Sequence, residues 1–413
     1  MNEQELPSLP LLARPRVESV LVDTPATLAD AVSKLAGGTG PFALDAERAS
    51  GFKYSQRAYL VQVHRLGTPI YLIDPISISP DHSIDAFVAL AGVLASDEWV
   101  LHAASQDIPC LRELGIYPQR LFDTELGSRI AGLPRVSLGA VCEHFLGIKL
   151  AKEHSAVDWS TRPLHADWLN YAALDVDVLL ELRSELSHSL EEMGRLEWAQ
   201  QEFANTAAMQ PKPAKVDKWR SMTGLTALKD ARKFAVAQHL WEARESLAVK
   251  LDVSPGRLVP DSSLVHVANT LPKSRPELAG DRGFVGRASR SYIDTWWAAV
   301  EAGLKTRELP PLKVKQEGIP NHRVWPGRFP EADARLRALR PVIQELAETL
   351  GLPPENLVTP DYIRQICWQP PQVITSDSIA NALAAFGARQ WQIGLVSEAV
   401  ASALIAAEPV EDD

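Results

Sequence analysis

Residues 41–75, "PFALDAERASGFKYSQRAYLVQVHRLGTPIYLIDP", decide the fold of the first half of the chain. "PFALDAER" predicts a strand, and "YLVQVHRLGTPIYLIDP" predicts two strands joined by a turn near Gly67. Further on, "SIDAFVALAGVLAS" has helical periodicity, "EWVLHAAS" returns as a strand, and "DIPCLRELG" is a short helix that ends at Gly115. This alternation predicts an α/β domain with a mixed sheet.

The chain becomes helical from residue 137 onward. "HADWLNYAALDVDVLLELRSELSHSL" predicts one long helix over 165–190. The segment 205–219, "NTAAMQPKPAKVDKW", has few large apolar residues and two prolines, which is typical of a linker. Everything after the linker has the pattern of helices joined by Pro/Gly turns.

An internal repeat lies in the helical part. "LAVKLDVSPGRLVPD" (247–261) and "LAETLGLPPENLVTPD" (346–361) share leucine, alanine, proline and aspartate positions, with one residue inserted in the second copy. Each copy predicts a helix end, a proline-containing turn and the start of another helix. About a hundred residues separate the copies, which indicates two small helical domains rather than a solenoid.

The bulk properties are those of a globular protein of more than one domain. The 413 residues are 46% hydrophobic and 23% charged, and the length favours two or three domains. The N-terminus, "MNEQELPSLPLLARPR", has acids where a signal peptide has bases, so we expect a cytoplasmic protein. Three scattered cysteines without CxxC spacing predict buried thiols rather than a zinc site or disulfides: Cys110, Cys142 and Cys367.

The charge is distributed unevenly along the chain. The formal net charge is −10, which argues against a protein that coats nucleic acid by bulk electrostatics. Residues 206–320 contain 19 Lys and Arg against 12 Asp and Glu, so this segment carries +7 and the remainder −17. An acidic body with a basic middle is compatible with a nucleic-acid enzyme whose binding surface is local.

Two short motifs place acids at strand ends. Asp45 and Glu47 lie two apart on a predicted strand and therefore project from one face, although such a pair is usually just solvated. Asp107 follows the apolar strand "WVLHA" at the carboxyl edge of the sheet, where α/β sites form. The alternative for Asp107 is an ordinary N-cap or first-turn acid.

A third motif lies on the predicted long helix. Tyr171 and Asp175 in "YAALD" are four residues apart and share a helix face. The alternative is a packed tyrosine with an exposed aspartate one turn later. Asp177 would point elsewhere.

The three motifs together are more specific than each alone. DxE, an Asp about sixty residues later and YxxxD about sixty-five further on resemble the DEDDy class of 3′–5′ exonucleases. "HAASQDIPCLRELG", "LFDTELGSRIAG" and "DWSTRPLHADWLNYAALDV" resemble ribonuclease D, and "DARKFAVAQHLWEARESLAVKLDVSPGRLVPDSSLVHVA" resembles an HRDC domain. The second copy of the repeat then looks like a second, more divergent HRDC domain.

The resemblance implies a fold and a division of the chain. The fold is an α/β catalytic domain, ribonuclease H-like with a mixed sheet, followed by two small all-α HRDC-like domains. The implied order is the exonuclease domain (1–204), a linker (205–218), the first HRDC domain (219–305) and the second, divergent one (306–413).

The resemblance also implies a chemistry. Asp45, Glu47, Asp107 and Asp175 would be ligands of two divalent ions, Mg²⁺ or Mn²⁺, with Asp45 as the bridge. Tyr171 would orient the attacking water, because a phenol with a pKa near 10 is a poor base. The implied activity is trimming of RNA with a free 3′ end, such as tRNA precursors and other small structured RNAs. We expect no membrane partner, and a monomer, since nothing in the sequence indicates an oligomer.

Two rival functions remain open from the sequence. A 3′–5′ DNA exonuclease could use the same four acids, because they do not read the 2′-hydroxyl. A non-catalytic nucleic-acid-binding scaffold is the other rival, although a scaffold has no need of the acids and the tyrosine.

Several further residues have open roles. Asp123 in "LFDTE" either supports the site or caps a turn, and His102 is expected to be a hydrogen-bonded core histidine. Arg162 either holds an RNA phosphate or braces Asp158. His154 could be a general base, but the tyrosine of the third motif argues against it.

Basic residues of the first HRDC-like segment are the candidates for RNA contact. They are Lys229, Arg232 and Lys233, together with Arg282, Arg287 and Arg290 around "GFVG". The alternative is a solvated helix face. The local charge of +7 favours phosphate contact, whereas the tryptophans are expected to pack: Trp296, Trp297 and Trp391.

Overall fold

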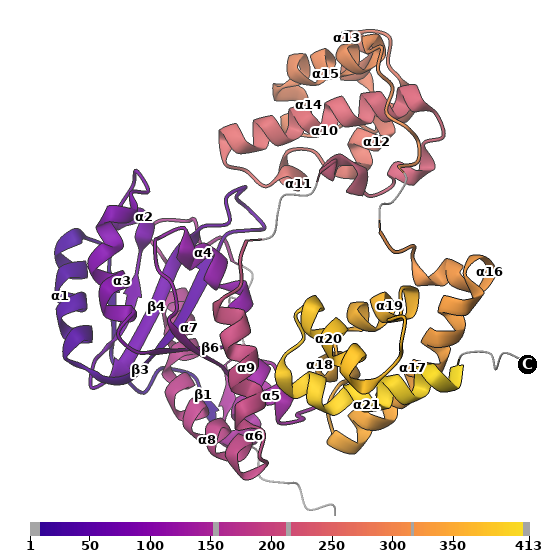
Figure 1. The fold of residues 1–413 in the computed structure, drawn as a ribbon. Coiled ribbons are helices and arrows are strands. Elements are labelled where there is room, and N and C mark those ends of the chain that lie inside the picture. The colour runs from indigo at the N-terminus through magenta and orange to yellow at the C-terminus, as the bar shows by residue number, and fades with distance from the viewer. Residues whose placement is uncertain (1–8, 152–156, 212–215, 315–317, 408–413) are drawn as a thin grey trace, which may run out of the picture.

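The computed structural model describes residues 9–151, 157–211, 216–314 and 318–407. Figure 1 shows three parts: a sheet-containing part at the lower left, a first helical unit at the top and a second helical unit at the lower right. His154 and part of the predicted linker lie outside the described residues.

A six-stranded mixed sheet forms the centre of the first part. Its order is β2-β5-β4-β3-β6-β7, and β1 and β8 form a separate parallel pair. The strands are β1 (Leu11–Leu12), β2 (Ser19–Val22), β3 (Thr39–Arg48), β4 (Ala58–Leu66), β5 (Ile70–Ile73), β6 (Glu98–Leu101), β7 (Arg120–Asp123) and β8 (Lys149–Leu150). β4 runs antiparallel to both β3 and β5, and the other pairs are parallel. The predicted α/β domain with a mixed sheet is confirmed.

The predicted turn near Gly67 is also confirmed. Gly67 lies between β4 and β5 with a φ of +86°, a backbone conformation that glycine adopts without the steric cost of a Cβ atom. β4 is buried along nearly its whole length, because it lies inside the sheet and is covered on both faces.

Helices cover both faces of the sheet, with α7 and α8 on one side and α1 and α3 on the other (Figure 1). The helices of this part are α1 (Pro25–Gly37), α2 (Pro75–Ile78), α3 (Val88–Leu94), α4 (Ile108–Arg112), α5 (Thr124–Ile130), α6 (Leu138–Phe145), α7 (Ala166–Asp177), α8 (Leu179–Glu192) and α9 (Leu196–Ala207). α9 continues three residues into the segment that the sequence predicts as a linker.

The predicted single helix over 165–190 is wrong. The helix is interrupted at Val178, which separates α7 from α8. α7 packs on β3, β4 and β5, whereas α8 packs on β3 and β6 and on α5. A change of direction at Val178 lets each helix follow its own part of a twisted sheet, and helical periodicity does not reveal such a break.

The first helical unit has a core of its own. Its helices are α10 (Ala231–Leu251), α11 (Pro255–Leu258), α12 (Asp261–Thr270), α13 (Arg275–Gly280), α14 (Arg287–Ser291) and α15 (Ile293–Lys305). α10 and α15 approach closely at Gly303, where an added Cβ atom would lie 2.5 Å from the Cα atom of Val236. Trp296 is fully buried in this core, as the sequence predicts.

The second helical unit repeats part of the first. Its helices are α16 (Trp325–Arg328), α17 (Pro330–Leu350), α18 (Pro354–Leu357), α19 (Pro360–Trp368), α20 (Ser376–Phe386) and α21 (Gln390–Ala407). α10 and α17 are both 21 residues long and both end at a left-handed residue, Asp252 or Gly351. A four-residue helix that begins with proline follows each of them. The local structure predicted for the repeat is confirmed.

Each helical unit is attached to the first part by specific contacts. In the turn after α10, the Asp252 carboxylate accepts a hydrogen bond of 2.9 Å from the backbone N–H of Ser55. In the second unit, Trp391 stacks on Trp198 of α9 with ring centroids 5.1 Å apart, and its indole N–H donates to Glu202 at 3.0 Å. The predicted packing role of Trp391 is confirmed.

The described parts of the chain contain no helix of the length and apolarity that a membrane crossing requires. The three cysteines are free and buried, as the sequence predicts.

Candidate active site

The two acids of β3 face the helix that carries the third motif. Asp45 and Glu47 pair with Gln62 and Leu60 of β4, so their side chains share one face of the sheet. α7 lies over this face and supplies Asp175. One carboxylate oxygen each from Asp45, Glu47 and Asp175 lies within 4.8 Å of the others. Three predicted ligands therefore meet at one point.

Asp107 lies in the same cavity. It is the N-cap residue of α4, as the alternative had it, but its side chain makes no capping hydrogen bond, so the carboxylate does not act as a cap. The cavity measures about 280 Å³. Its lining residues are Asp45, Ala46, Glu47, Arg48, His102, Ala103, Gln106, Asp107, Leu138, Tyr171, Asp175 and Leu179.

The four carboxylates repel one another in a buried place. Burial raises the pKa of Asp45 to about 6. Burial, and then the charge of Asp45, raise the pKa of Glu47, Asp107 and Asp175 well above the usual range. The charge of Asp45 acts on each of the other three acids, so Asp45 lies among all of them. Hard oxygen donors whose charges repel one another fit Mg²⁺ or Mn²⁺.

Tyr171 belongs to this cluster through Asp175. The two side chains line the same cavity, and the pKa of Tyr171 is raised by burial and by the charge of Asp175. A phenol with a raised pKa keeps its proton at neutral pH. It then serves as a hydrogen-bonding group rather than as a base.

Arg48 lines the cavity although the sequence did not single it out. Strict alternation places Arg48 on the opposite face from Glu47. The pairing of β3 with β4 shifts register between Glu47 and Arg48, and Arg48 pairs with Ala58 rather than Tyr59. No pattern in the sequence predicts this register shift.

His102 has the hydrogen bond that the sequence predicts. Its Nδ1 atom lies 2.9 Å from the Thr124 hydroxyl oxygen, and burial lowers its pKa to about 4. However, it is half-buried at the cavity wall rather than inside the core.

Asp123 combines the two roles left open for it. Its carboxylate caps α5 by accepting from the N–H groups of Glu125 and Leu126 at 3.0 and 3.1 Å. It also accepts from the N–H groups of Ala103 and Ala104 at 3.0 and 2.9 Å. Asp123 thereby fixes the loop that leads to Asp107.

Both expectations for Arg162 are wrong. Its guanidinium forms two hydrogen bonds of 2.7 Å with Asp74 and further bonds with three backbone carbonyls. Asp158 instead accepts from Ser160. A guanidinium so fully used has no donors left for a phosphate. Asp177 points away from the cavity to Arg16, as predicted.

The basic residues of the first helical unit have different surroundings. Arg232 donates to the carbonyls of Gly303 and Thr306 at the end of α15. Lys229 donates to the Thr226 carbonyl, and Lys233 to Asn269. Three arginines are exposed and have no hydrogen bond or ion pair within the described residues: Arg282, Arg287 and Arg290.

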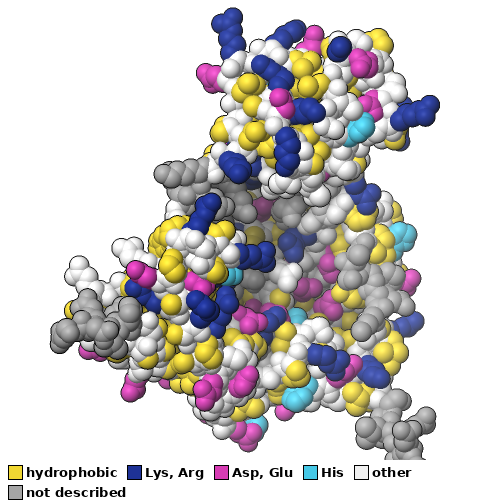
Figure 2. Space-filling view, turned by 90° about the vertical axis from the view of Figure 1, so that its right-hand side faces the viewer, with side chains coloured by type: hydrophobic (Ala, Val, Ile, Leu, Met, Phe, Trp, Pro, Cys, Tyr) yellow, Lys and Arg dark blue, Asp and Glu magenta, His cyan; other side chains and the backbone are white. Residues whose placement is uncertain are grey.

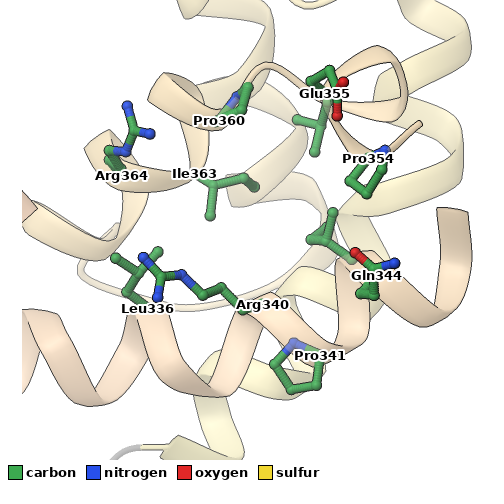
Figure 3. A pocket seen from close by; sticks show the side chains of 11 residues that line it. Leu336, Arg340, Pro341, Gln344, Pro354, Glu355, Pro360, Ile363 and Arg364 are labelled. Atoms are coloured by element: carbon green, nitrogen blue, oxygen red, sulfur yellow. The ribbon is translucent and has the colours of Figure 1, made fainter.

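A second cavity lies inside the second helical unit. It measures about 460 Å³ and lies between α17, α18 and α19 (Figure 3). Ile363 points into it, and its ionisable lining residues are Arg340, Arg364 and Glu355. With one carboxylate, it lacks the donor set of the cavity around Asp45.

Models of three families match most of the chain. A 3′–5′ exonuclease model matches residues 19–191, an HRDC model 233–300, and a 3′ to 5′ exonuclease C-terminal domain model 318–404. The first covers all five residues of the predicted site.

Several curated relatives are named ribonuclease D. Ribonuclease D of Granulibacter bethesdensis is 33% identical over 242 residues, and that of Escherichia coli is 28% identical over 349 residues, 82% of this chain and 88% of the relative. The match with the Granulibacter protein covers 56% of this chain and 60% of that relative's length.

Solved structures extend the similarity to the whole chain. A protein from Bifidobacterium adolescentis superposes with a TM-score of 0.87 at 36% identity and covers 96% of this chain and 100% of its own. Escherichia coli RNase D superposes with a TM-score of 0.65 at 26% identity, over 89% of this chain and 99% of its own. An exonuclease domain with a mixed sheet, an HRDC domain and these relatives lead to one conclusion: the chain belongs to the ribonuclease D family.

Proposed function

We propose that the protein is a metal-dependent 3′–5′ exoribonuclease that hydrolyses the last phosphodiester bond of an RNA and releases nucleoside 5′-monophosphates. The observation that carries the proposal is the meeting of Asp45, Glu47 and Asp175, with one oxygen from each within 4.8 Å. Relatives named ribonuclease D support the choice of RNA.

The proposed ligands are the four acids of the cavity. Asp45, Glu47, Asp107 and Asp175 would together hold two divalent ions. Two ions, when bound, stabilise the charge on the attacking and leaving oxygens of a phosphodiester displacement. Tyr171 would hold the attacking water by a hydrogen bond, since its raised pKa keeps its hydroxyl protonated.

The proposed substrates are RNAs with single-stranded 3′ ends, including tRNA precursors and other small structured RNAs. The Escherichia coli relative is described as an exoribonuclease involved in structured RNA processing. Figure 2 shows a hollow between the first helical unit at the top and the rest of the molecule, with Lys and Arg side chains along it. A hollow with basic walls suits an RNA strand.

We further propose that the first helical unit contacts RNA phosphates. Arg287 and Arg290 are the stronger candidates, because both are exposed and without a partner in the described structure. Lys229 and Lys233 keep two of their three donors free for a phosphate. Arg232 is the weakest candidate, because two carbonyls already occupy its guanidinium.

We also propose that residues 306–413 form a second HRDC-like domain. Support comes from the shared arrangement of α10–α12 and α17–α19.

The test is digestion of a 5′-labelled RNA with a single-stranded 3′ tail, with Mg²⁺, with Mn²⁺ and with EDTA. We expect a ladder that shortens from the 3′ end, needs the metal and disappears in Asp45→Asn. A parallel DNA strand of the same sequence should be cut more slowly. Equal or faster cutting of DNA would favour the DNA exonuclease, and RNA binding without any cutting would favour the scaffold.

A further inference from the structure

Arg48 is the cation of the proposed active site. Among the side chains that line the cavity, it alone carries a permanent positive charge. It immediately follows Glu47 on β3, and its charge acts on three of the acids, Asp45, Glu47 and Asp107. Its guanidinium therefore lies close to the proposed metal ligands.

An irregularity in the sheet places Arg48 there. In a regular ladder Arg48 would point to the face opposite Glu47. The pairing with β4 shifts register between these two residues, so that Tyr59 is skipped and Arg48 pairs with Ala58, and Arg48 lines the cavity. Bulges and similar irregularities next to active sites commonly re-aim one side chain.

The guanidinium of Arg48 is not used by the protein. In the described structure it has no hydrogen bond and no ion pair within 4.0 Å, although four carboxylates line the same cavity. An arginine that served to neutralise these acids would form short, paired hydrogen bonds with one of them. Arg162 forms such bonds with Asp74, so the chain is able to build them.

With two divalent ions bound, the charges in the cavity would sum to one positive charge. Two divalent ions would balance four carboxylates, and Arg48 then adds a single positive charge. A phosphodiester carries a single negative charge, and a guanidinium fork matches two of its oxygens.

We propose that Arg48 binds the non-bridging oxygens of the phosphate that joins the last two nucleotides of the RNA. This inference rests on the proposed exonuclease function and deepens it by assigning a phosphate-binding residue to the same cavity. Arg48 would hold that phosphate and stabilise the added charge of its transition state.

The experiment compares Arg48→Gln and Arg48→Lys with Arg120→Gln. The control removes the same charge from an exposed residue at the start of β7, whose partner is Asp97. Three quantities are measured: kcat and KM on the tailed RNA, inhibition by AMP and by adenosine, and Mn²⁺ affinity by calorimetry. AMP carries the product phosphate and adenosine lacks it.

The expected result separates phosphate binding from metal binding. Arg48→Gln should lower kcat by roughly 10²- to 10³-fold, as the loss of one group that stabilises transition-state charge does. Inhibition by AMP should weaken about 10-fold or more, while inhibition by adenosine and Mn²⁺ affinity stay the same. Arg48→Lys should recover part of the AMP inhibition, because it keeps the charge without the fork.

Three outcomes would overturn the inference while the wild type and Arg120→Gln remain active. They are unchanged kcat and AMP inhibition in Arg48→Gln, equal weakening of AMP and adenosine inhibition, or a loss of Mn²⁺ affinity that accounts for the loss of kcat. Inactive wild-type protein in the presence of metal would overturn the proposed function itself, and the inference with it.

Discussion

Two charged regions of one sheet, at β5 and at β3 on either side of β4, differ in how their charges are satisfied. After β5, Asp74 is 2% exposed and accepts two hydrogen bonds from Arg162 at 2.7 Å. It also accepts from the Ser77 hydroxyl and from two backbone N–H groups. On β3, Asp45 and its neighbouring acids have no ion pair with Arg48, and their pKa values are raised by burial.

The difference distinguishes a structural charge from a functional one. At Asp74 the chain itself supplies the opposite charge and the donors, so the gain is stability. At Asp45 the same chain gathers four carboxylates and one arginine that forms no ion pair with them, which costs stability unless something binds. The comparison predicts that substitutions in the first region change stability, and that those in the second change activity.

The largest effect on stability is expected for Arg162→Met. This substitution leaves the buried Asp74 carboxylate without its ion-pair partner and should lower the free energy of unfolding by about 3–5 kcal/mol. Urea unfolding measures this, and the double substitution Asp74→Leu with Arg162→Met should recover much of the loss. Activity per folded molecule should stay within about threefold, because neither residue lines the cavity. A loss of activity without a loss of stability would break the comparison.

Asp123→Ala should affect both stability and activity. Four backbone N–H groups lose their acceptor, two in the first turn of α5 and two in the loop before Asp107. We expect a loss of about 2–3 kcal/mol in the free energy of unfolding. Since the loop positions Asp107, kcat should also fall. Full activity at a temperature where the variant is folded would mean that Asp107 needs no such support.

Asp45→Asn should make the metal-free protein more stable. Removing one of four mutually repelling carboxylates should raise the free energy of unfolding by about 1–2 kcal/mol. Added Mn²⁺ should raise the melting temperature of the wild type and leave that of the variant nearly unchanged. Calorimetric melting with and without Mn²⁺ measures both. A destabilised variant would show that Asp45 is held by partners of its own, as Asp74 is.

The smallest effect is a pH dependence that arises from His102. Its pKa is lowered from 6.5 to about 4 in the folded protein, so between these values the unfolded chain binds more protons. His102 therefore costs stability as the pH falls from about 6.5 to 4, on the order of 1 kcal/mol for a half-buried ring. Unfolding midpoints of wild type and His102→Gln at pH 7.5, 6 and 5 should converge toward neutral pH and diverge below it. Parallel curves would contradict this assignment.

Much of the site could be predicted because its residues follow regular periodicities. Asp45 and Glu47 share a strand face, and Tyr171 and Asp175 share a helix face, in the structure as in the pattern. The failures arise where a local irregularity or a distant partner decides. Arg48 lies in the cavity beside a register shift between β3 and β4. The ion-pair partner of Arg162 is Asp74, which is 88 residues away in the chain.

The sequence by itself determined the mixed α/β domain, the helical repeat and the residues of the proposed site, because strand and helix periodicities are local properties of the chain. Only the tertiary structure decided which charges are paired, that the helix over 165–190 breaks at Val178, and that Arg48 joins the acids. The physical reason is that pairing and burial depend on residues far apart in the chain, which no local pattern brings together.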